Sequence, residues 1–371
     1  MDHINKVVLV GHPFAPIGRG EDIRCSYRAL RSVAVNAGLL DVFASCPPDK
    51  DEAAEFSASL VNSPGAVNIF HLNGDEIENA ASVLGGLPRS GYNIVYPAWE
   101  LARYPQSWAA QLDRFDEIWA PSKFIAESLC DVVRKPVHEM PLASEVMLTS
   151  LLNRRLFGIP HSAYAFLFFF DFRSYRSRKN PEAVIAAFRR LRDARPNADV
   201  CLVIKVSGSS HAPKELEKLK REMAELRERA VILDQAMSDN QVKNLIRSCD
   251  CFISLHRSEG FGRGLAEAMY LEKPVIATAY SGNMDFMDSS TAMLVDYDLI
   301  PVEEGEYPHS EKQVWADAST MRAAEHMVSL IDDRKEGTRL GKRASLKVRS
   351  AIGYRPAGLR YKRRIESILA Q

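Results

Sequence analysis

Residues 251–278 of this 371-residue chain read CFISLHRSEGFGRGLAEAMYLEKPVIAT. An apolar run at 251–255 leads into a glycine-rich loop, and the loop opens a helical pattern over 264–271. A second apolar run follows at 275–278. Short, continuously apolar strands joined by a helix predict parallel strands in a sheet that is covered on both faces.

The same alternation extends outward in both directions. In the second half, strands are expected at 166–170, 200–206, 231–233, 251–255, 275–278 and 293–295, with helices at 181–195, 213–229, 239–248 and 264–271. In the first half, strands are expected at 7–10, 67–70, 94–96 and 118–120, with helices at 21–36 and after Ser122. The pattern weakens between Pro141 and Pro160, which indicates a domain junction.

The expected fold is therefore α/β, with two Rossmann-like, doubly wound parallel-sheet domains that face a central cleft. We expect an N-terminal domain over residues 1–155 and a second domain over 156–350. The remaining residues, 351–371, are expected to form a C-terminal helix that packs back on the first domain.

The composition narrows the class of protein. Lys and Arg total 48 and Asp and Glu total 48, so the formal net charge is zero, whereas a nucleic-acid binder would carry a basic excess. Hydrophobic residues make up 46% and charged residues 26%, which is ordinary globular usage. Nucleic acid is therefore not expected as a partner.

Targeting and metal signals point to a cytoplasmic protein. No stretch approaches the roughly 18–20 apolar residues that span a bilayer, and residues 1–6 lack the basic-then-apolar order of a signal peptide. Six cysteines and nine histidines show no zinc-ligand spacing. No metal and no cofactor are expected.

The loop and helix at 256–269 combine groups that suit a nucleotide sugar. Its glycines allow close backbone approach, and the N-terminus of the following helix offers N–H groups and a positive dipole to a phosphate. The carboxylates of Glu259 and Glu267 can each accept hydrogen bonds from a vicinal diol. The alternative is an ordinary strand–helix turn with a solvated Glu259 and a capping Glu267.

These residues also carry a family resemblance. Glu259 and Glu267, with seven residues between them in EGFGRGLAEAM, resemble the donor-site signature of family-4 retaining glycosyltransferases, which belong to glycosyltransferase group 1 and have the GT-B fold. The resemblance continues through KPVIAT at 273–278 and SGNMD at 281–285. Arg263-Gly264 departs from it, because many members have an apolar residue and a proline there.

The resemblance implies roles for the donor site in the second domain. Glu267 would bind the ribose hydroxyls, and Glu259 would contact the transferred sugar or stabilise charge near the anomeric carbon. The amides around Phe261 and Gly262 would face the diphosphate. The residues expected at the donor nucleotide sugar are Arg173, Arg178, Lys179, Lys205, Phe261, Gly262, Arg263, Gly264 and Glu267.

The cations in that set answer a chemical need. A departing nucleoside diphosphate gains negative charge, which some cation must stabilise when no metal is present. Family members commonly place an Arg and a Lys five or six residues apart in the loop at 171–181, and Arg173 and Lys179 match best, with Arg178 a competitor. Lys205 is a further candidate, because a charge inside an apolar strand needs a partner. A solvated surface position is the alternative for any single cation in this loop.

The first domain is expected to bind the acceptor. Its loop at 11–22 resembles the glycine-rich acceptor loop of the family and supplies Gly18, Arg19 and Gly20. Arg19 could meet an acceptor phosphate or pair with a neighbouring carboxylate, and both interpretations stay open.

Three further side chains follow strands of this domain. Glu100 stands where many relatives place a histidine or aspartate beside the transferred sugar, and Trp99 could stack on a sugar face. His71 is either an acceptor contact or a core histidine with satisfied hydrogen bonds.

The implied function is retaining transfer of a hexose from a nucleotide-diphosphate sugar to a saccharide or lipid-linked saccharide acceptor, in surface polysaccharide or lipopolysaccharide synthesis. The patterns at Asn180-Pro181 and Tyr307-Pro308 look like O-antigen enzymes, which favours GDP-mannose over UDP-glucose. The residues expected in catalysis are Glu259, Glu100, Lys179 and Arg173. The alternatives are a GT-B-fold nucleotide-sugar epimerase or hydrolase, and a non-catalytic nucleotide-sugar-binding protein.

The neutral total hides a basic segment. Residues 334–364 contain twelve Lys or Arg and one acidic residue, Glu336. Such an excess would favour peripheral contact with anionic lipid on the inner face of the cytoplasmic membrane, at about 1 kcal/mol per nearby cation. The alternative is a pair of soluble helices with basic, solvated faces.

Overall fold

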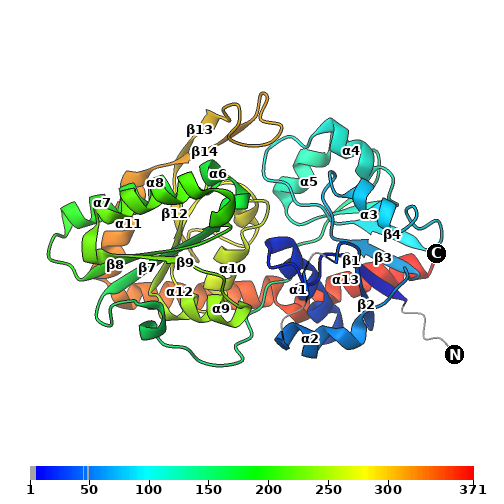
Figure 1. Ribbon diagram of the computed structural model, residues 1–371, viewed down its shortest axis with the longest axis horizontal. Helices are drawn as coiled ribbons and strands as arrows, with labels where there is room; N and C mark the ends of the chain where they lie inside the picture. The colour runs from blue at the N-terminus through cyan, green and yellow to red at the C-terminus, as the bar shows by residue number, and fades with distance from the viewer. Residues whose placement is uncertain (1–5, 45, 48–49) are drawn as a thin grey trace. The chain divides into compact units, whose positions relative to one another are not determined.

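The computed structural model describes residues 6–44, 46–47 and 50–371 (Figure 1). They divide into two compact units, one made of the residues up to Glu145 together with Ser350–Gln371 and the other of Val146–Arg349. Each unit contains a six-stranded sheet. The predicted fold class, two Rossmann-like α/β units, is confirmed.

In the first unit the strands run in the order β2-β1-β3-β4-β5-β6, and all pairs are parallel. The strands are β1 (Val7–Gly11), β2 (Ala37–Asp41), β3 (Val67–Phe70), β4 (Tyr92–Val95), β5 (Glu117–Ala120) and β6 (Val137–Glu139). The helices are α1 (Gly18–Ser32), α2 (Lys50–Phe56), α3 (Ile77–Val83), α4 (Gln106–Leu112), α5 (Lys123–Leu129) and α13 (Tyr354–Leu369). Strand order reverses beside β1, so the carboxyl ends of β1 and β3 meet at the edge where such sheets bind ligands.

In the second unit the order is β12-β11-β10-β7-β8-β9, again with parallel pairs. The strands are β7 (Tyr164–Asp171), β8 (Val200–Ser207), β9 (Ala230–Asp234), β10 (Cys251–Ser254), β11 (Val275–Thr278) and β12 (Met293–Val295). The helices are α6 (Arg176–Lys179), α7 (Pro181–Ala194), α8 (Pro213–Ala224), α9 (Asp239–Ser248), α10 (Arg263–Tyr270), α11 (Thr320–Asp332) and α12 (Arg334–Ile352). An antiparallel pair, β13 (Tyr297–Pro301) and β14 (Val314–Ala318), follows β12.

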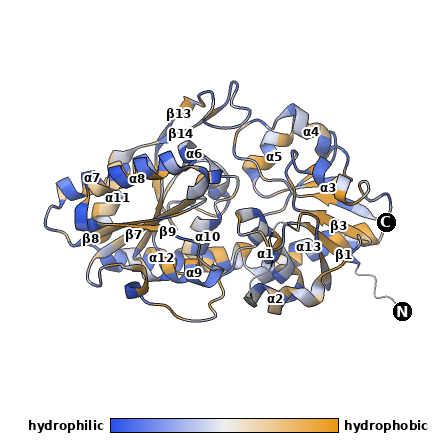
Figure 2. Ribbon diagram, viewed as in Figure 1, coloured by the Kyte–Doolittle hydropathy of each residue, from blue (hydrophilic) through white to orange (hydrophobic). Residues whose placement is uncertain are grey.

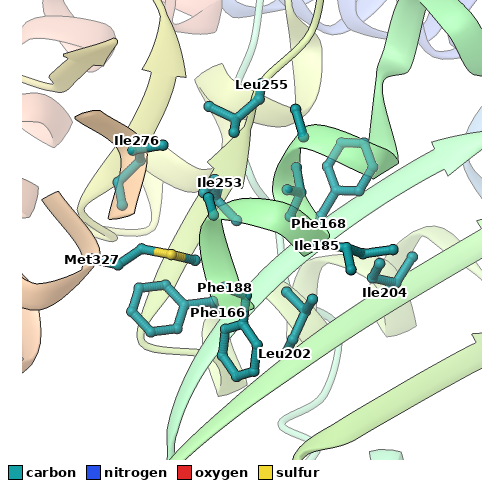
Figure 3. Packing of buried hydrophobic residues seen from close by; sticks show 14 of the residues in the cluster. Phe166, Phe168, Ile185, Phe188, Leu202, Ile204, Ile253, Leu255, Ile276 and Met327 are labelled. Atoms are coloured by element: carbon teal, nitrogen blue, oxygen red, sulfur yellow. The ribbon is translucent and has the colours of Figure 1, made fainter. Parts of the chain in front are cut away.

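The core of the second unit lies between its sheet and three helices, α7, α8 and α11. Phe166, Phe168 and Phe170 of β7 belong to one buried cluster. Figure 3 shows Phe166 and Phe168 among side chains that include Ile185 and Phe188 of α7 and Met327 of α11. Burying a phenylalanine contributes about 1.5–3 kcal/mol, so this cluster is a large part of what holds the unit together. Figure 2 shows apolar residues gathered along the strands of both sheets, as expected for parallel strands buried on two faces.

Helix α13 packs along α1 in the first unit. Gly358 approaches α1 so closely that a Cβ there would lie 2.1 Å from the carbonyl oxygen of Ala29. The ring of Tyr361 stacks on Trp119 with centroids 5.3 Å apart. Arg364 forms an ion pair with Glu117, a carboxylate that is fully buried in β5. These contacts make α13 an integral part of the first unit.

Several cations of the basic segment are paired within the chain. Arg339 and Arg343 bond Glu336 at 2.9 and 3.0 Å, and Lys347 bonds Asp288. Among the described residues, no helix is long and apolar enough to cross a membrane.

The structure adds elements that the sequence pattern did not predict. β2 and β6 are short strands of the first sheet, and the β13–β14 hairpin follows β12. Helix α1 begins at Gly18 rather than residue 21. The helix predicted at 213–229 ends at Ala224, after which Arg227 takes a left-handed φ of 54°.

We predict that Gly358→Ala lowers the melting temperature. The added methyl group must separate α13 from the backbone of α1, and overpacking of this kind typically costs about 1–3 kcal/mol. Gly337→Ala in α12 is the matched control, because its Cβ would press only on the flexible end of Leu330. Thermal denaturation of both variants checks this, and equal melting temperatures would contradict the packing argument.

Candidate active site

The turn from β10 into the start of α10 requires glycine at two positions, one at the N-cap of the helix and one in its first turn. Gly262 precedes α10 with a left-handed φ of 91°, which other residues rarely adopt. A Cβ at Gly264 would lie 2.8 Å from the ring of Phe169 on β7. Glycine at 264 therefore lets the first turn of α10 pack directly on the sheet, which places the helix N-terminus beside the end of the strands.

Glu259 lies in this loop with its carboxylate between two cations. Lys179 bonds Oε1, and Arg178 Nη1 lies 3.2 Å from Oε2. The Glu259 side chain is 13% exposed. Burial opposes ionisation, but Lys179 and Arg178 outweigh it and lower the pKa of Glu259 to about 2. The carboxylate is therefore ionised across the physiological range.

The backbone between β7 and α7 brings the two cations to this point. Tyr175 has a φ of 62°, so the chain turns sharply into the single helical turn α6. Asn180, also left-handed, caps α7 through Oδ1 and donates from Nδ2 to the carbonyl of Leu255 at 3.1 Å. The start of α7 is thereby fastened to the end of β10, and Arg178 and Lys179 face the Glu259 loop.

A buried polar network supports the loop. Nε2 of His256 lies 3.0 Å from Oδ1 of Asn283, and Nδ1 lies 3.1 Å from Oγ of Ser254. Asn283 donates in turn to the carbonyl of Thr278. Burial lowers the pKa of His256 although Glu259 opposes this, so the ring is neutral at pH 7. This network was not predicted from the sequence, although a histidine directly after the apolar strand β10 is a signal for it.

Ser281 fixes the backbone of Glu259. Its Oγ accepts the Glu259 amide at 2.8 Å, and the amide of Gly282 donates to the Glu259 carbonyl at 2.9 Å. Ser281 has a φ of 75°, a strained conformation for a residue with a side chain. The strained residue Ser281 is therefore the one that holds the loop of Glu259, an expected catalytic residue, in place.

The other residues expected at the donor site differ in their burial and in whether they contact Glu259. Arg173 is 42% exposed and pairs with Asp171, with Nη2 2.7 Å from Oδ2, so the structure brings Arg178 rather than Arg173 to Glu259. Lys205 is buried near the end of β8, where burial lowers its pKa and Asp171 partly offsets this. Glu267 is buried on α10.

Phe261 and Arg263 surround the start of α10. The ring of Phe261 packs on Phe286, with centroids 5.2 Å apart. The guanidinium of Arg263 lies 5.9 Å from the centre of the Phe261 ring. Among the described residues, no group of three or more His, Cys, Asp or Glu is arranged to hold a metal ion.

In the first unit, the expected acceptor loop is held by its own contacts. Arg19 donates from Nη2 to the carbonyl of Tyr96 at 2.6 Å and pairs with Asp22 at 3.3 Å, so it makes the intramolecular pair that the sequence left open. Gly18 begins α1. A Cβ at Gly20 would lie 2.1 Å from the carbonyl oxygen of Ala15, so this turn requires glycine.

The aromatic candidates lie in the core of that unit. Trp99 is 2% exposed, packs on Tyr104 and Trp108, and donates its Nε1–H to the carbonyl of Arg103. This packing role differs from the expected stacking on a sugar. His71 is fully buried beside Tyr96, and Glu100 is half-buried after β4.

A polar pair that the sequence analysis missed joins the ends of β1 and β3. Nε2 of His12 lies 2.8 Å from Oε1 of Glu76, and the imidazole stacks on Phe43 with centroids 3.7 Å apart. Burial opposes ionisation of Glu76, but His12 and Arg19 lower its pKa. His12 and Glu76 are 64 residues apart in the chain, so no local sequence motif predicts that they pair.

Comparison with known families identifies the region around Glu259. Residues 166–296 match the family model for glycosyl transferases group 1. The second unit carries a glycosyltransferase group 1 domain. This domain runs from β7 to β12 and includes Arg178, Lys179 and Glu259. No curated protein sequence matches the chain.

Solved structures similar to the chain extend beyond the glycosyltransferase domain. HepE from Anabaena, in complex with UDP and glucose, has a TM-score of 0.70 at 14% identity, covering 97% of this chain and 99% of that one. A glycosyltransferase from Rickettsia africae and sucrose-phosphate synthase from Thermosynechococcus elongatus each have a TM-score of 0.70 at 13% identity, covering 98% of this chain and 99% of theirs. At this identity the likeness establishes the two-unit GT-B fold.

The ionised state of Glu259 predicts a pH-dependent stability. Its folded pKa of about 2 lies below the ordinary 4.5, so its contribution is present above pH 4.5 and is lost as the pH falls through the folded value. Between pH 6 and pH 3, the unfolding free energy of the wild type should fall about 2 kcal/mol more than that of Glu259→Gln.

Urea denaturation at several pH values measures this difference. Asp332→Asn is the control, because Asp332 pairs with Arg195 on the exposed surface. It should follow the wild type at every pH. Parallel stability curves for the wild type and Glu259→Gln would contradict the assignment of a buried, ionised carboxylate.

Proposed function

We propose that the chain is a retaining glycosyltransferase that moves a hexose from a nucleotide-diphosphate sugar to a saccharide or lipid-linked saccharide acceptor. The observation that carries the proposal is the buried Glu259 carboxylate between Lys179 and Arg178 within the glycosyltransferase group 1 domain. The HepE complexes with UDP and with UDP-glucose support a donor of this chemical class.

The two cations suit a departing diphosphate. As the glycosidic bond breaks, charge grows on the phosphate oxygens, and preorganised cations in a partly desolvated site stabilise it strongly. Lys179 and Arg178 supply two positive charges against one on Glu259, so a net positive charge remains for the donor. The N-terminus of α10 adds backbone N–H groups. We propose that this set works without a metal or cofactor.

Glu259 is proposed to position the donor sugar rather than to attack it. A carboxylate whose two oxygens are occupied by cations is a weak nucleophile, because its charge is already neutralised. Retention would then proceed on one face of the sugar, with the leaving diphosphate taking the proton of the acceptor hydroxyl. Glu267 is proposed to bind the ribose.

The acceptor is proposed to bind the first unit at the carboxyl ends of β1, β3 and β4. There Arg19, the His12–Glu76 pair and Glu100 follow neighbouring strands. Hydroxyl groups of a saccharide suit this mixture of donors and acceptors. Surface polysaccharide or lipopolysaccharide synthesis on the inner face of the cytoplasmic membrane is the proposed setting.

GDP-mannose is the proposed donor, with UDP-glucose as its rival. Incubation of the protein with a panel of radiolabelled nucleotide sugars, with and without lipid-linked saccharide acceptor, tests both. Transfer that requires the acceptor supports the proposal. Sugar release or epimerisation without acceptor indicates a hydrolase or epimerase, and binding without turnover indicates a sensor.

We predict that Glu259→Ala reduces transfer at least a thousandfold while the fold is kept. The loss follows from the unpaired cations and the missing sugar contact. Glu217→Ala, an exposed carboxylate on α8, is the control and should transfer normally. Initial rates with circular dichroism spectra check this. Near-normal transfer by Glu259→Ala would refute its role.

Peripheral membrane contact is proposed through basic residues on exposed positions of α12, including Lys335 and Lys342. We expect vesicles containing phosphatidylglycerol to retain the protein at low salt. Lys335→Ser/Lys342→Ser should weaken the binding about 30-fold, because each surface cation contributes about 1 kcal/mol. Vesicle co-sedimentation measures this, with phosphatidylcholine vesicles as the control. No retention by anionic vesicles at low salt would end the membrane proposal.

A further inference from the structure

The β13–β14 hairpin begins immediately after residue 296, where the match to the family model ends. Its strands pair from Tyr297–Ala318 to Pro301–Val314, and residues 302–313 connect them. The hairpin and its connecting segment contact both loops that form the Glu259 site. The hairpin therefore contacts the site, although it lies outside the residues that match the family model.

Arg257, two residues before Glu259, is enclosed by the hairpin. Its carbonyl accepts the amide of Ala316 at 2.9 Å, and its guanidinium lies 5.2 Å from the centre of the Trp315 ring. Nη1 lies 3.5 Å from the carboxylate of Glu306. Backbone, aromatic and ionic contacts therefore hold the same residue, and its side chain is only 20% exposed.

Tyr307, in the connecting segment, contacts the loop that supplies the cations. Its ring centroid lies 4.8 Å from that of Tyr175, and the guanidinium carbon of Arg178 lies 5.9 Å from it. Tyr307 is 8% exposed. A guanidinium at this distance over a partly desolvated aromatic face is stabilised by a cation–π interaction.

The two loops are also joined to each other at this point. The amide of Arg257 donates to the carbonyl of Arg178 at 2.8 Å, and Nη1 donates to the carbonyl of Ser177 at 3.3 Å. Tyr175 has a left-handed φ of 62°, which costs of order 1 kcal/mol and persists only when surrounding contacts enforce it. Packing of Tyr307 on Tyr175 is a contact of this kind.

We infer that the β13–β14 hairpin is a working part of the donor site, in which Tyr307 and Glu306 are positioning residues that hold Arg178 and Lys179 against Glu259. Only the expected effect of these residues on sugar transfer rests on the proposed function. Glu306 acts through Arg257, and Tyr307 acts through Tyr175 and Arg178. The donor site is then larger than the segment that matches the family model.

Hydrogen–deuterium exchange tests the structural part without any substrate. In Tyr307→Leu, peptides covering residues 175–180 should exchange at least tenfold faster than in the wild type, because the amides of Lys179 and Asn180 bond within this turn. Tyr307→Phe keeps the ring and should stay within twofold of the wild type. Leu299→Ala, on an exposed position of β13, is the control and should not change these peptides.

The pH profile of transfer tests the catalytic part. The wild type should lose little kcat/KM between pH 7.5 and pH 4.5, because its carboxylate stays ionised. In Tyr307→Leu, looser cations let the pKa of Glu259 rise toward 4.5, and kcat/KM should fall about twofold more over this range. A role in folding alone would lower activity equally at every pH.

The outcomes separate this inference from the proposed function. Unchanged exchange in Tyr307→Leu, or equal exchange in Tyr307→Leu and Tyr307→Phe, overturns the role of the ring in positioning the loop. A wild-type protein that transfers no sugar from any nucleotide donor refutes the proposed function, while the exchange experiment still decides whether the hairpin holds the loop.

Discussion

The ion pair that joins Glu259 to Lys179 and Arg178 is the interaction on which the rest of the second unit's site depends. A buried carboxylate is costly to desolvate, and the two cations outweigh that cost for the ionised form of Glu259. The strained turn at Tyr175 and the Asn180 cap hold the cations in register. Two cations against one carboxylate leave a net positive charge, which suits an anionic ligand.

The sequence revealed the sheets because parallel strands buried on both faces are continuously apolar, as in β7 and β8. The strand–loop–helix turn that carries Glu259 was predictable because its constraints are local: a glycine with positive φ and a glycine packed against the sheet must stand at fixed offsets in the chain. A short edge strand such as β6 has too few residues to show a continuous apolar run or a motif with fixed spacing.

The contact partners of individual side chains could not be predicted from the sequence, because they depend on how separate segments of the chain fold together. Arg173 and Arg178 are both arginines in one loop, and only the folded turn shows that Asp171 takes the first and Glu259 the second. The indole of Trp99 is able to stack on a sugar ring, yet Tyr104 and Trp108 enclose it in the core. The hairpin contacts of Arg257 likewise join residues about 60 positions apart.

The packing of α13 on α1 has a consequence for how the molecule is made. Helices that lie against each other at a glycine are separated here by more than 300 residues of chain, with the whole second unit synthesised between them. On the ribosome, the glycosyltransferase domain can complete its core while the surface of α1 still waits for its covering helix. Helix α1 is therefore made before the second unit, yet it belongs to a unit that is completed only after the second unit has been made.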